Sequence, residues 1–563
     1  MRTLSALRPL LSLAAVASLS LFANSQVTYG GLPPSSYDAL LSNAAPTQLM
    51  PEVETWRLIA EDEVAPKNQP ARFGEEIPVQ LTLGNSGRWD RLANGDRVWR
   101  LRIESDGAYS ISLIFNDFEL PPGAELYAYN DKKDVVYGQF NMANNKNNRM
   151  FAIQPLPGDA MTLEYFEPAA TVAPGSISIS TVVHDYRDVV GMLEEQTMGN
   201  PKAAGSCNND VNCPEGAAWD DQIRSVAAIF IGGGLCTGSM INNTANDGTQ
   251  YFITANHCGG MNNATFRFNY QKSGCGSGSA PTSMSVQGSS LLKASSNGDY
   301  RLVRLTETIP ADYNVYMEGW DRSNTTPSST VSITHPQVGV KKISFDFDAP
   351  AKSGGDWRII KWDDGVTEPG SSGGPLYSDE GLFIGALYGG AATCSFPYDD
   401  YYPRFGNNFS ALSQWLNPTG SSAQTLQGRE LYGSPPVGCG VTKFGMGVGG
   451  ANTARLDCPD SPTLGSTVLL RSSGLGQGST AYLILSLGNP TTPLFGGTLF
   501  VNYLNPFAQI PVLLNNGIAT YNLALPSASG LAYLTGHAQM VAPDAAQAQG
   551  WTFSNGLALT FCP

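Results

Sequence analysis

Glycine and proline interrupt this chain so often that it cannot be built from long helices. The 563 residues include 61 glycines and 37 prolines, and both residue types are typical of turns. Frequent turns favour short strands, so we expect an all-β protein. The length is too great for one hydrophobic core and predicts three or four domains. A hydrophobic content of 42% with 14% charged residues is ordinary for globular protein.

The N-terminus and the net charge predict an exported protein. A positively charged start precedes a short apolar stretch at 9–23, and the small residues Ala23 and Ser25 predict signal cleavage before Gln26. No later segment offers the ~20 apolar residues that a membrane span needs. A net charge of -15 argues against nucleic-acid binding. We therefore expect a secreted, extracellular monomer without a membrane anchor.

Nine cysteines fit an oxidising compartment. Six lie in the middle of the chain, namely Cys207, Cys213, Cys236, Cys258, Cys275 and Cys394. Three more follow, Cys439, Cys458 and Cys562, and spacing does not say which of them is left over. With four histidines and no C-x-x-C pair, a zinc site is not indicated, and we expect no metal and no cofactor.

The cysteine distribution and the turn-rich stretches divide the chain. We predict a signal peptide at 1–25, a β-rich block at 26–202, a six-cysteine block at 203–420, a Gly/Ser/Pro-rich linker at 421–438, and a β-sandwich-like C-terminal domain at 439–563.

Local patterns support this division. In the β-rich block, apolar residues alternate at 97–103 and 108–115, which predicts two strands joined by a hairpin-like turn at 104–107. Helical spacing at 409–418 predicts a helix stopped by Pro418. Strand-like stretches follow at 480–488, 497–504 and 556–561.

The stretch 369-PGSSGGPLYS-378 holds a candidate nucleophile. It could be only a Gly/Ser turn before a strand. A serine hydroxyl becomes a nucleophile when an imidazole takes its proton, a carboxylate fixes that imidazole, and backbone donors hold the oxyanion. Ser372 is the candidate.

Of the four histidines, His257 has the best setting for a base. It follows an apolar strand in 251-YFITANHCGG-260, where a disulfide of Cys258 could pin its loop. His184 lies in the β-rich block, His537 lies in the tail, and His335 before a proline suggests a structural role.

Asp299, in 296-SNGDYRLVRL-305, begins a strand that enters the core and is the candidate carboxylate.

The residues 370-GSSGG-374 also match the G-x-S-x-G elbow of α/β-hydrolases. Those enzymes need the order Ser, acid, His on a sheet interleaved with helices. The order here is His257, Asp299, Ser372, so the esterase interpretation fails.

The same order on a cysteine-linked β-frame resembles the chymotrypsin-like serine proteases. Three segments carry this resemblance, 254-TANHC-258, 299-DYRLVRL-305 and 370-GSSGGP-375. The resemblance sharpens toward bacterial lysyl endopeptidases over roughly 203–418. The segments that carry it are 207-CNNDVNCPEG-216, 237-TGSMINNTAND-247, 365-GVTEPGSSG-373 and 399-DDYYPRFG-406.

The resemblance implies a double β-barrel and a set of roles. Ser372 would be the nucleophile, His257 the general base and then acid, and Asp299 the orienting carboxylate. The N–H groups of Gly370 and Ser372 would form the oxyanion hole. Ser371 stands where animal relatives carry an Asp that pairs with a new N-terminal amine. Latency should therefore come from 26–202, as a propeptide that covers the site or guides folding; the alternative is a permanent binding domain.

Substrate residues are also implied by the resemblance. Trypsin's pocket acid would stand at Val366, which cannot supply it. In lysyl endopeptidases the acid precedes an aromatic and an arginine, which points to Asp400, with Asp399 as the second candidate. Alternatively, these residues form only a solvated acidic loop without a role in binding. Tyr388 stands where strictly lysyl members carry His, and the strand through Gly389 should pair with the substrate backbone.

The resemblance implies three disulfides and a processing site. The pairs would be Cys207–Cys394, Cys213–Cys275 and Cys236–Cys258. Lys202 lies five residues before Cys207, so a lysine-directed enzyme could release its own domain there.

The expected function is a secreted endopeptidase acting on proteins or peptides after basic residues, lysine preferred. Alternatives are a broader Lys/Arg protease, an inactive peptide- or surface-binding relative, and a binding role of the tail.

Overall fold

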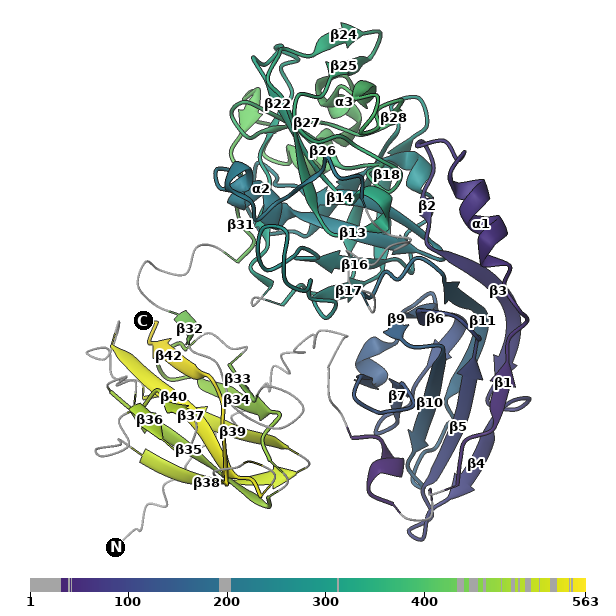
Figure 1. The fold of residues 1–563 in the computed structure, drawn as a ribbon, viewed down its shortest axis with the longest axis vertical. Coiled ribbons are helices and arrows are strands. Elements are labelled where there is room, and N and C mark those ends of the chain that lie inside the picture. The colour runs from purple at the N-terminus through teal and green to yellow at the C-terminus, as the bar shows by residue number, and fades with distance from the viewer. Residues whose placement is uncertain are drawn as a thin grey trace, which may run out of the picture.

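The computed structural model describes residues 32–432 without 39–40, 42, 192–203 and 311–312, and 440–562 without several short gaps. The predicted signal peptide, Lys202 and Cys439 lie outside the described residues. Strands dominate the described part of the chain (Figure 1), and the all-β prediction is confirmed. The main helices in that part are α1 Thr55–Asp62, α2 Asp220–Ser225 and α3 Phe405–Leu416. None of the helices described is long and apolar enough to cross a membrane.

The described residues of the β-rich block fold into two sheets around one core. The first sheet has the order β1-β5-β10-β7-β8 with β4 beside β5, and the second has the order β3-β11-β6-β9. Trp99, Leu113, Phe115 and Leu163 are among the side chains that fill the core. The strands are β1 Thr47–Leu49, β3 Gly74–Thr82, β4 Arg88–Arg91, β5 Arg97–Glu104, β6 Ser110–Glu119, β7 Glu125–Tyr129, β8 Val136–Phe140, β9 Phe151–Pro157, β10 Ala160–Glu167 and β11 Ser176–Asp185.

The hairpin predicted at 104–107 is wrong, although both of its strands exist. β5 lies in the first sheet and β6 in the second, so the turn crosses between sheets. Alternating apolar residues show that a strand has one buried face but do not say which strand is its neighbour. Here the two strands bury their apolar residues in the same core.

Two sheet systems form the half-barrels of a chymotrypsin-like double β-barrel. The first has the order β17-β16-β13-β14-β15-β19-β18, and the second β12-β23-β22-β26-β27-β21-β30, accompanied by a sheet β24-β25-β29-β28. The first comprises β13 Val226–Ile231, β14 Gly234–Met240, β15 Tyr251–Thr254, β16 Thr265–Phe268, β17 Ser285–Gln287, β18 Ser289–Ser295 and β19 Tyr300–Leu305. The others are β12 Asn209–Asp210, β21 Trp320–Asp321, β22 Thr330–Thr334, β23 Lys342–Asp346, β24 Ala351–Ser353, β25 Asp356–Lys361, β26 Pro375–Ser378, β27 Phe383–Ala386, β28 Gly389–Gly390, β29 Tyr398–Pro403 and β30 Thr425–Leu426.

Two segments complete the barrels at their C-terminal end. The helix predicted at 409–418 is present as α3, which begins earlier and packs Phe405 and Phe409 against Trp320. In the stretch predicted as a linker, β30 pairs with β21, and β31 Arg429–Glu430 pairs with β20 Tyr316–Met317. Much of that stretch therefore packs on the barrels, and the domain boundary itself stays a prediction.

The C-terminal residues form a large sheet of order β32-β42-β40-β35-β38-β39-β34-β33, with β41 beside β40 and a separate pair β36-β37. Cys458 is buried in its core, and Cys562 is disulfide-bonded. A β-sandwich remains a prediction for this part. The strands are β32 Gly440–Phe444, β33 Arg455–Asp457, β34 Thr467–Ser473, β35 Thr480–Ser486, β36 Thr492–Leu494, β37 Gly497–Leu499, β38 Ala508–Asn515, β39 Ile518–Ala524, β40 Thr535–Pro543, β41 Trp551–Phe553 and β42 Gly556–Thr560.

A buried carboxyl group joins the two barrels. Glu318 is fully buried and accepts hydrogen bonds from Ser239 at 2.7 Å, Tyr377 at 2.6 Å and Ser225 at 3.3 Å. Ser239 lies on β14 of the first barrel and Tyr377 on β26 of the second. Burial raises the pKa of Glu318 to about 8, although the three hydroxyl donors oppose that rise. Near neutral pH, burial therefore favours the protonated form of the carboxyl group that links the barrels.

We expect Glu318 to make the fold less stable as the pH rises. The pKa of Glu318 in the folded protein exceeds its ordinary value. The stabilisation that Glu318 gives the fold is therefore complete below about pH 4.5 and is lost as the pH rises to about 8. Glu318→Gln cannot ionise, so the fall in unfolding free energy between these limits should shrink by roughly 2 kcal/mol or more. Thermal unfolding across this range in a Ser372→Ala background compares the two proteins, and parallel curves would contradict the prediction.

Candidate active site

His257 and Asp299 form a hydrogen-bonded pair at one end of the first barrel. His257 Nδ1 lies 2.7 Å from Asp299 Oδ2, and the His257 backbone N–H donates to Oδ1 at 2.9 Å. A carboxylate only accepts, so Nδ1 carries the proton and Nε2 is left as the basic atom. Asp299 has a φ of 39° just before β19, a left-handed conformation that Asp tolerates better than most residues. One carboxylate thus fixes both the ring and the backbone of His257.

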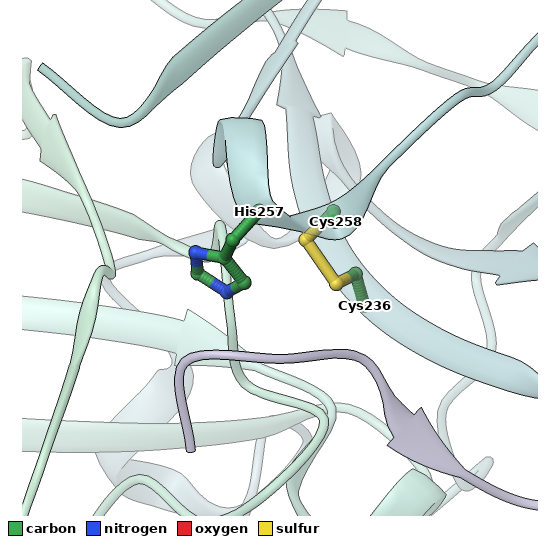
Figure 2. A group of neighbouring side chains, drawn as sticks. All are labelled: Cys236, His257 and Cys258. Atoms are coloured by element: carbon green, nitrogen blue, oxygen red, sulfur yellow. A yellow bond between two sulfur atoms is a disulfide. The ribbon is translucent and has the colours of Figure 1, made fainter. Parts of the chain in front are cut away.

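The Cys236–Cys258 disulfide fixes the loop that carries His257. Cys236 lies on β14, and Cys258 directly follows the histidine. Figure 2 shows the imidazole beside this disulfide, with the purple chain that leads into β2 Ala71–Arg72 running past both. The three side chains cluster closely, but the two sulfur atoms are bonded to each other and do not offer thiolates to a metal. Two further disulfides of the protease part are Cys207–Cys394 and Cys213–Cys275, the same pairings that the resemblance implies.

The remaining histidines are poor candidates for a general base. His335 is fully buried and stacks on Tyr270 with ring centroids 5.7 Å apart. His184 lies 2.7 Å from the Ser105 hydroxyl in the β-rich block, and His537 lies in the tail. Burial lowers the pKa of all three imidazoles, which disfavours the protonated form that a base must pass through.

Ser372 lies in a tight turn whose glycines are required by the backbone. Gly370 has a φ of 98° and Gly373 a φ of 79°. A Cβ on Gly370 would lie 2.6 Å from the His335 carbonyl oxygen, and one on Gly373 would lie 2.0 Å from Thr254 Oγ1. Only glycine fits both the dihedral angles and the space.

The turn is anchored to the first barrel next to the loop of His257. The Thr237 N–H donates to the Ser372 carbonyl oxygen at 2.8 Å, and the Thr237 hydroxyl donates to the Gly370 carbonyl oxygen at 2.9 Å. Cys258 Sγ lies 3.8 Å from that Ser372 oxygen. The three candidate catalytic residues are therefore brought to one place where the barrels meet.

Two backbone donors beside Ser372 are uncommitted. Among the described residues, the N–H groups of Gly370 and Ser372 have no acceptor, whereas the Ser371 N–H donates to the Glu368 carbonyl oxygen at 3.0 Å. The Ser371 hydroxyl is buried and donates to Thr334 Oγ1 at 3.0 Å. A pair of free amides next to a serine hydroxyl is the arrangement that stabilises an oxyanion.

A buried carboxylate lies next to this turn, where the resemblance places the acid of a substrate pocket. Asp400 is fully buried, and its Oδ2 accepts hydrogen bonds from Trp362 Nε1 and from the Thr367 hydroxyl, each at 2.7 Å. A Cβ on Gly390 would lie 2.3 Å from Asp400 Oδ1. The glycine thus keeps open the space in front of the oxygen that these two donors leave available.

Asp399, the rival of Asp400, points elsewhere. Successive residues of a strand face opposite sides, and the Asp399 carboxylate accepts from Arg358 Nε at 2.7 Å on the neighbouring strand β25. Tyr388 is 40% exposed, and its ring lies edge-on to the His257 imidazole at a centroid distance of 6.1 Å. Tyr388 and Asp400 therefore border the same site, and Asp399 does not.

The pocket is occupied by a lysine of the N-terminal block. Lys67 Nζ donates to the Thr367 carbonyl oxygen at 2.7 Å, to the Thr367 hydroxyl at 3.1 Å and to Asp400 Oδ1 at 3.3 Å. Burial lowers the pKa of the Lys67 ammonium, and the Asp400 charge opposes that effect. The Lys67 carbonyl oxygen accepts a hydrogen bond of 2.5 Å from the Ser372 hydroxyl.

Sequence reasoning did not identify Lys67, Trp362, Thr367 or Gly390. Thr367 follows Val366, the position of trypsin's pocket acid, and Gly390 follows Gly389. Neither Thr367 nor Gly390 has a sequence signal of its own. Trp362 and Lys67 carry no local signal, because only the folded chain brings them to Asp400.

Comparison with known proteins points to one family. Residues 201–403 match the family model described as lysyl endopeptidase, C-terminal domain. A lysyl endopeptidase of Pseudomonas aeruginosa is 26% identical over 369 residues, which are 59% of this chain and 77% of that protein.

Solved structures of protease domains cover smaller parts of the chain. The MamO protease domain from Magnetospirillum magneticum has 14% identity, covers 34% of this chain and 98% of its own, and gives a TM-score of 0.24. A serine protease of a human pathogenic astrovirus has 13% identity, covers 32% of this chain and 90% of its own, and gives a TM-score of 0.22. The family match spans His257, Asp299, Ser372 and Asp400, so the part of the chain that holds the candidate site is similar to the C-terminal domain of lysyl endopeptidases.

Proposed function

We propose that this protein is a secreted serine endopeptidase that cleaves proteins and peptides on the carboxyl side of basic residues, with lysine preferred. The observation that carries the proposal is the position of Lys67, whose ammonium lies against Asp400 and Thr367 while its carbonyl oxygen contacts the Ser372 hydroxyl. A lysine side chain therefore reaches the acidic pocket from a backbone position beside the candidate nucleophile.

The proposed reaction begins when Ser372 Oγ attacks the carbonyl carbon that follows the lysine. The serine proton passes to His257 Nε2, and Asp299 stabilises the resulting imidazolium through its 2.7 Å contact with Nδ1. The carbonyl oxygen becomes an oxyanion and accepts hydrogen bonds from the free N–H groups of Gly370 and Ser372.

Collapse of this intermediate breaks the peptide bond. The leaving amine takes the proton from His257, and an ester between Ser372 and the substrate's acyl group remains. A water molecule then loses a proton to His257 and attacks the ester. This attack forms a second tetrahedral intermediate. When that intermediate collapses, His257 returns the proton to Ser372 Oγ and the new carboxyl group is released.

The pocket chemistry favours lysine over arginine. Lys67 Nζ has three acceptor contacts around one nitrogen atom, which suits the three donors of an ammonium group. A guanidinium prefers both oxygens of a carboxylate, but Asp400 Oδ2 is already bonded to Trp362 and Thr367. The bidentate pairing that would reward arginine is therefore blocked.

Export and synthesis as a preproenzyme belong to the same proposal. The signal-like N-terminus predicts secretion, and the three disulfides of the protease part fit an oxidising compartment. The N-terminal block that places Lys67 in the pocket acts as the propeptide, and cleavage after Lys202 would release the mature protease.

We expect the purified mature enzyme to cut a denatured protein after lysine far more often than after arginine. Mass spectrometry of the peptides gives the frequency of each cleavage. Equal cutting after both residues would withdraw the lysine preference and keep the acidic pocket. No cutting by a folded, mature protein would favour an inactive peptide-binding relative.

A further inference from the structure

The loop around Lys67 does not cross the site as a substrate strand would. Pro66, before the lysine, and Pro70, after it, border one cavity together with Gly234 and Pro369. Both flanks of Lys67 therefore lie beside this one cavity, while the lysine side chain between them reaches Asp400. A substrate of an enzyme of this type instead runs extended through the site.

The residue after Lys67 lies where a residue before the cut belongs. Asn68 donates from Nδ2 to the Tyr388 hydroxyl at 3.1 Å, and its backbone N lies 3.4 Å from the point where a Cβ on Gly389 would stand. The strand through Tyr388 and Gly389 is expected to pair with the acyl side of a substrate, on the N-terminal side of the bond that is cut. From Lys67 to Asn68, the chain therefore runs in the direction opposite to that of a bound substrate.

The Lys67 carbonyl group is not arranged for attack. Its oxygen accepts the Ser372 hydroxyl hydrogen bond, whereas neither the Gly370 N–H nor the Ser372 N–H donates to it. His257 Nε2 is buried and has no partner among the described residues. The serine proton thus points at the carbonyl oxygen and away from the base, which leaves both nucleophile and oxyanion hole unused.

The loop is held by contacts of its flanking chain with the first barrel of the protease. β2 pairs with β14 through Ala71 opposite Leu235, and the Phe73 N–H donates to the Gly233 carbonyl oxygen at 2.8 Å. Farther along the block, the Val189 carbonyl oxygen accepts from Arg267 at 3.2 Å and from Tyr270 at 2.9 Å. Because these anchors are on the same chain, the effective concentration of Lys67 at the pocket is high.

We propose that residues 66–70 form a non-cleavable plug, in which Lys67 fills the lysine pocket with reversed chain polarity and keeps the precursor latent. This inference rests on the proposed function, since it assigns the pocket to lysine side chains. The plug inhibits the enzyme by binding the site that recognises lysine in substrates. Because its chain runs in the reversed direction, the plug is not cleaved.

The first experiment measures occupancy without relying on activity. The full-length Ser372→Ala protein is treated briefly with an amine-acetylating reagent, and mass spectrometry compares Lys67 with Lys132, an exposed lysine of the same block. Lys67 should react at least about tenfold more slowly than Lys132, as expected for an ammonium held by charge-assisted hydrogen bonds. Equal reactivity would overturn the plug. Protection of Lys67 in a protein whose mature form shows no protease activity would support the plug and refute the proposed function.

The second experiment measures latency and polarity. Freshly isolated precursors of the wild type, Lys67→Gln and the matched control Lys132→Gln are compared in hydrolysis of a small lysyl ester. Lys67→Gln should raise the initial rate about 10- to 100-fold, and Lys132→Gln should leave it unchanged. In wild-type protein left to mature, the Lys67–Asn68 bond should stay intact after the bonds that follow exposed lysines are cut. An early cut after Lys67 would show that the loop is a substrate. If the Lys67→Gln precursor hydrolysed the ester no faster than the wild-type precursor while its mature form was active, Lys67 would have no inhibitory role.

Discussion

Ser372→Ala should reduce kcat/KM for a lysyl peptide by about 10⁴-fold or more. The substitution removes the atom that forms the acyl-enzyme and leaves the His257–Asp299 pair in place. The free amides of Gly370 and Ser372 would still polarise a bound carbonyl group, so a small residual rate over water is expected. Steady-state kinetics on the purified mature protein give the ratio.

The adjacent serine is the matched control for this prediction. Ser371 is also buried, but its hydroxyl donates to Thr334 and does not face the Lys67 carbonyl group. Ser371→Ala should therefore keep kcat/KM within about tenfold of the wild type, since it loses only two buried hydrogen bonds, one to Thr334 and one from the Glu368 N–H, each worth about 1–3 kcal/mol of stability. A large loss in Ser371→Ala with a small one in Ser372→Ala would exchange their roles and overturn the mechanism.

The sequence located the candidate catalytic residues because each has a local signature. His257 stands between a strand and a cysteine, Ser372 stands between glycines that the turn requires, and Asp299 begins a strand. Their chain order then excluded the esterase alternative. The pairing of Asp299 with His257 at 2.7 Å needed the fold, since 42 residues separate them.

The rest of the site depends on tertiary structure that leaves no local trace. Trp362 and Thr367 hold one oxygen of Asp400, yet they lie on different segments of the chain. Lys67 is 333 residues from Asp400 and 305 residues from Ser372. No pattern of charge or spacing near Lys67 predicts that its side chain fills a pocket so far along the chain.

The wrong hairpin at 104–107 has a related cause. Alternation in β5 and β6 reports one buried face for each strand, and that information is the same whether the strands pair or face each other across a core. The choice between those arrangements was made by partners distant in sequence, β10 for the first strand and β11 for the second.

Asp400→Asn should lower kcat/KM for a lysyl peptide by about 10²- to 10³-fold, as expected when one partner of a buried charge pair is removed. Asn is nearly the same size, so it still fills the space beside Trp362 and Thr367. It cannot neutralise an ammonium group that has left water for a fully buried site. The loss should be much smaller for a peptide with norleucine in place of lysine, because that side chain brings no charge into the pocket.

The comparison with norleucine separates recognition from damage to the fold. If Asp400→Asn merely distorted the protein, kcat/KM would fall equally for both peptides; selective loss with lysine assigns the carboxylate to the cation. Asp399→Asn is the matched control, because that carboxylate is bound to Arg358 outside the pocket and should leave the lysine-to-norleucine ratio unchanged. Reversal of the two results would move the specificity acid to Asp399. It would also remove the physical basis for lysine preference, because that argument requires the acid whose second oxygen is held by Trp362 and Thr367.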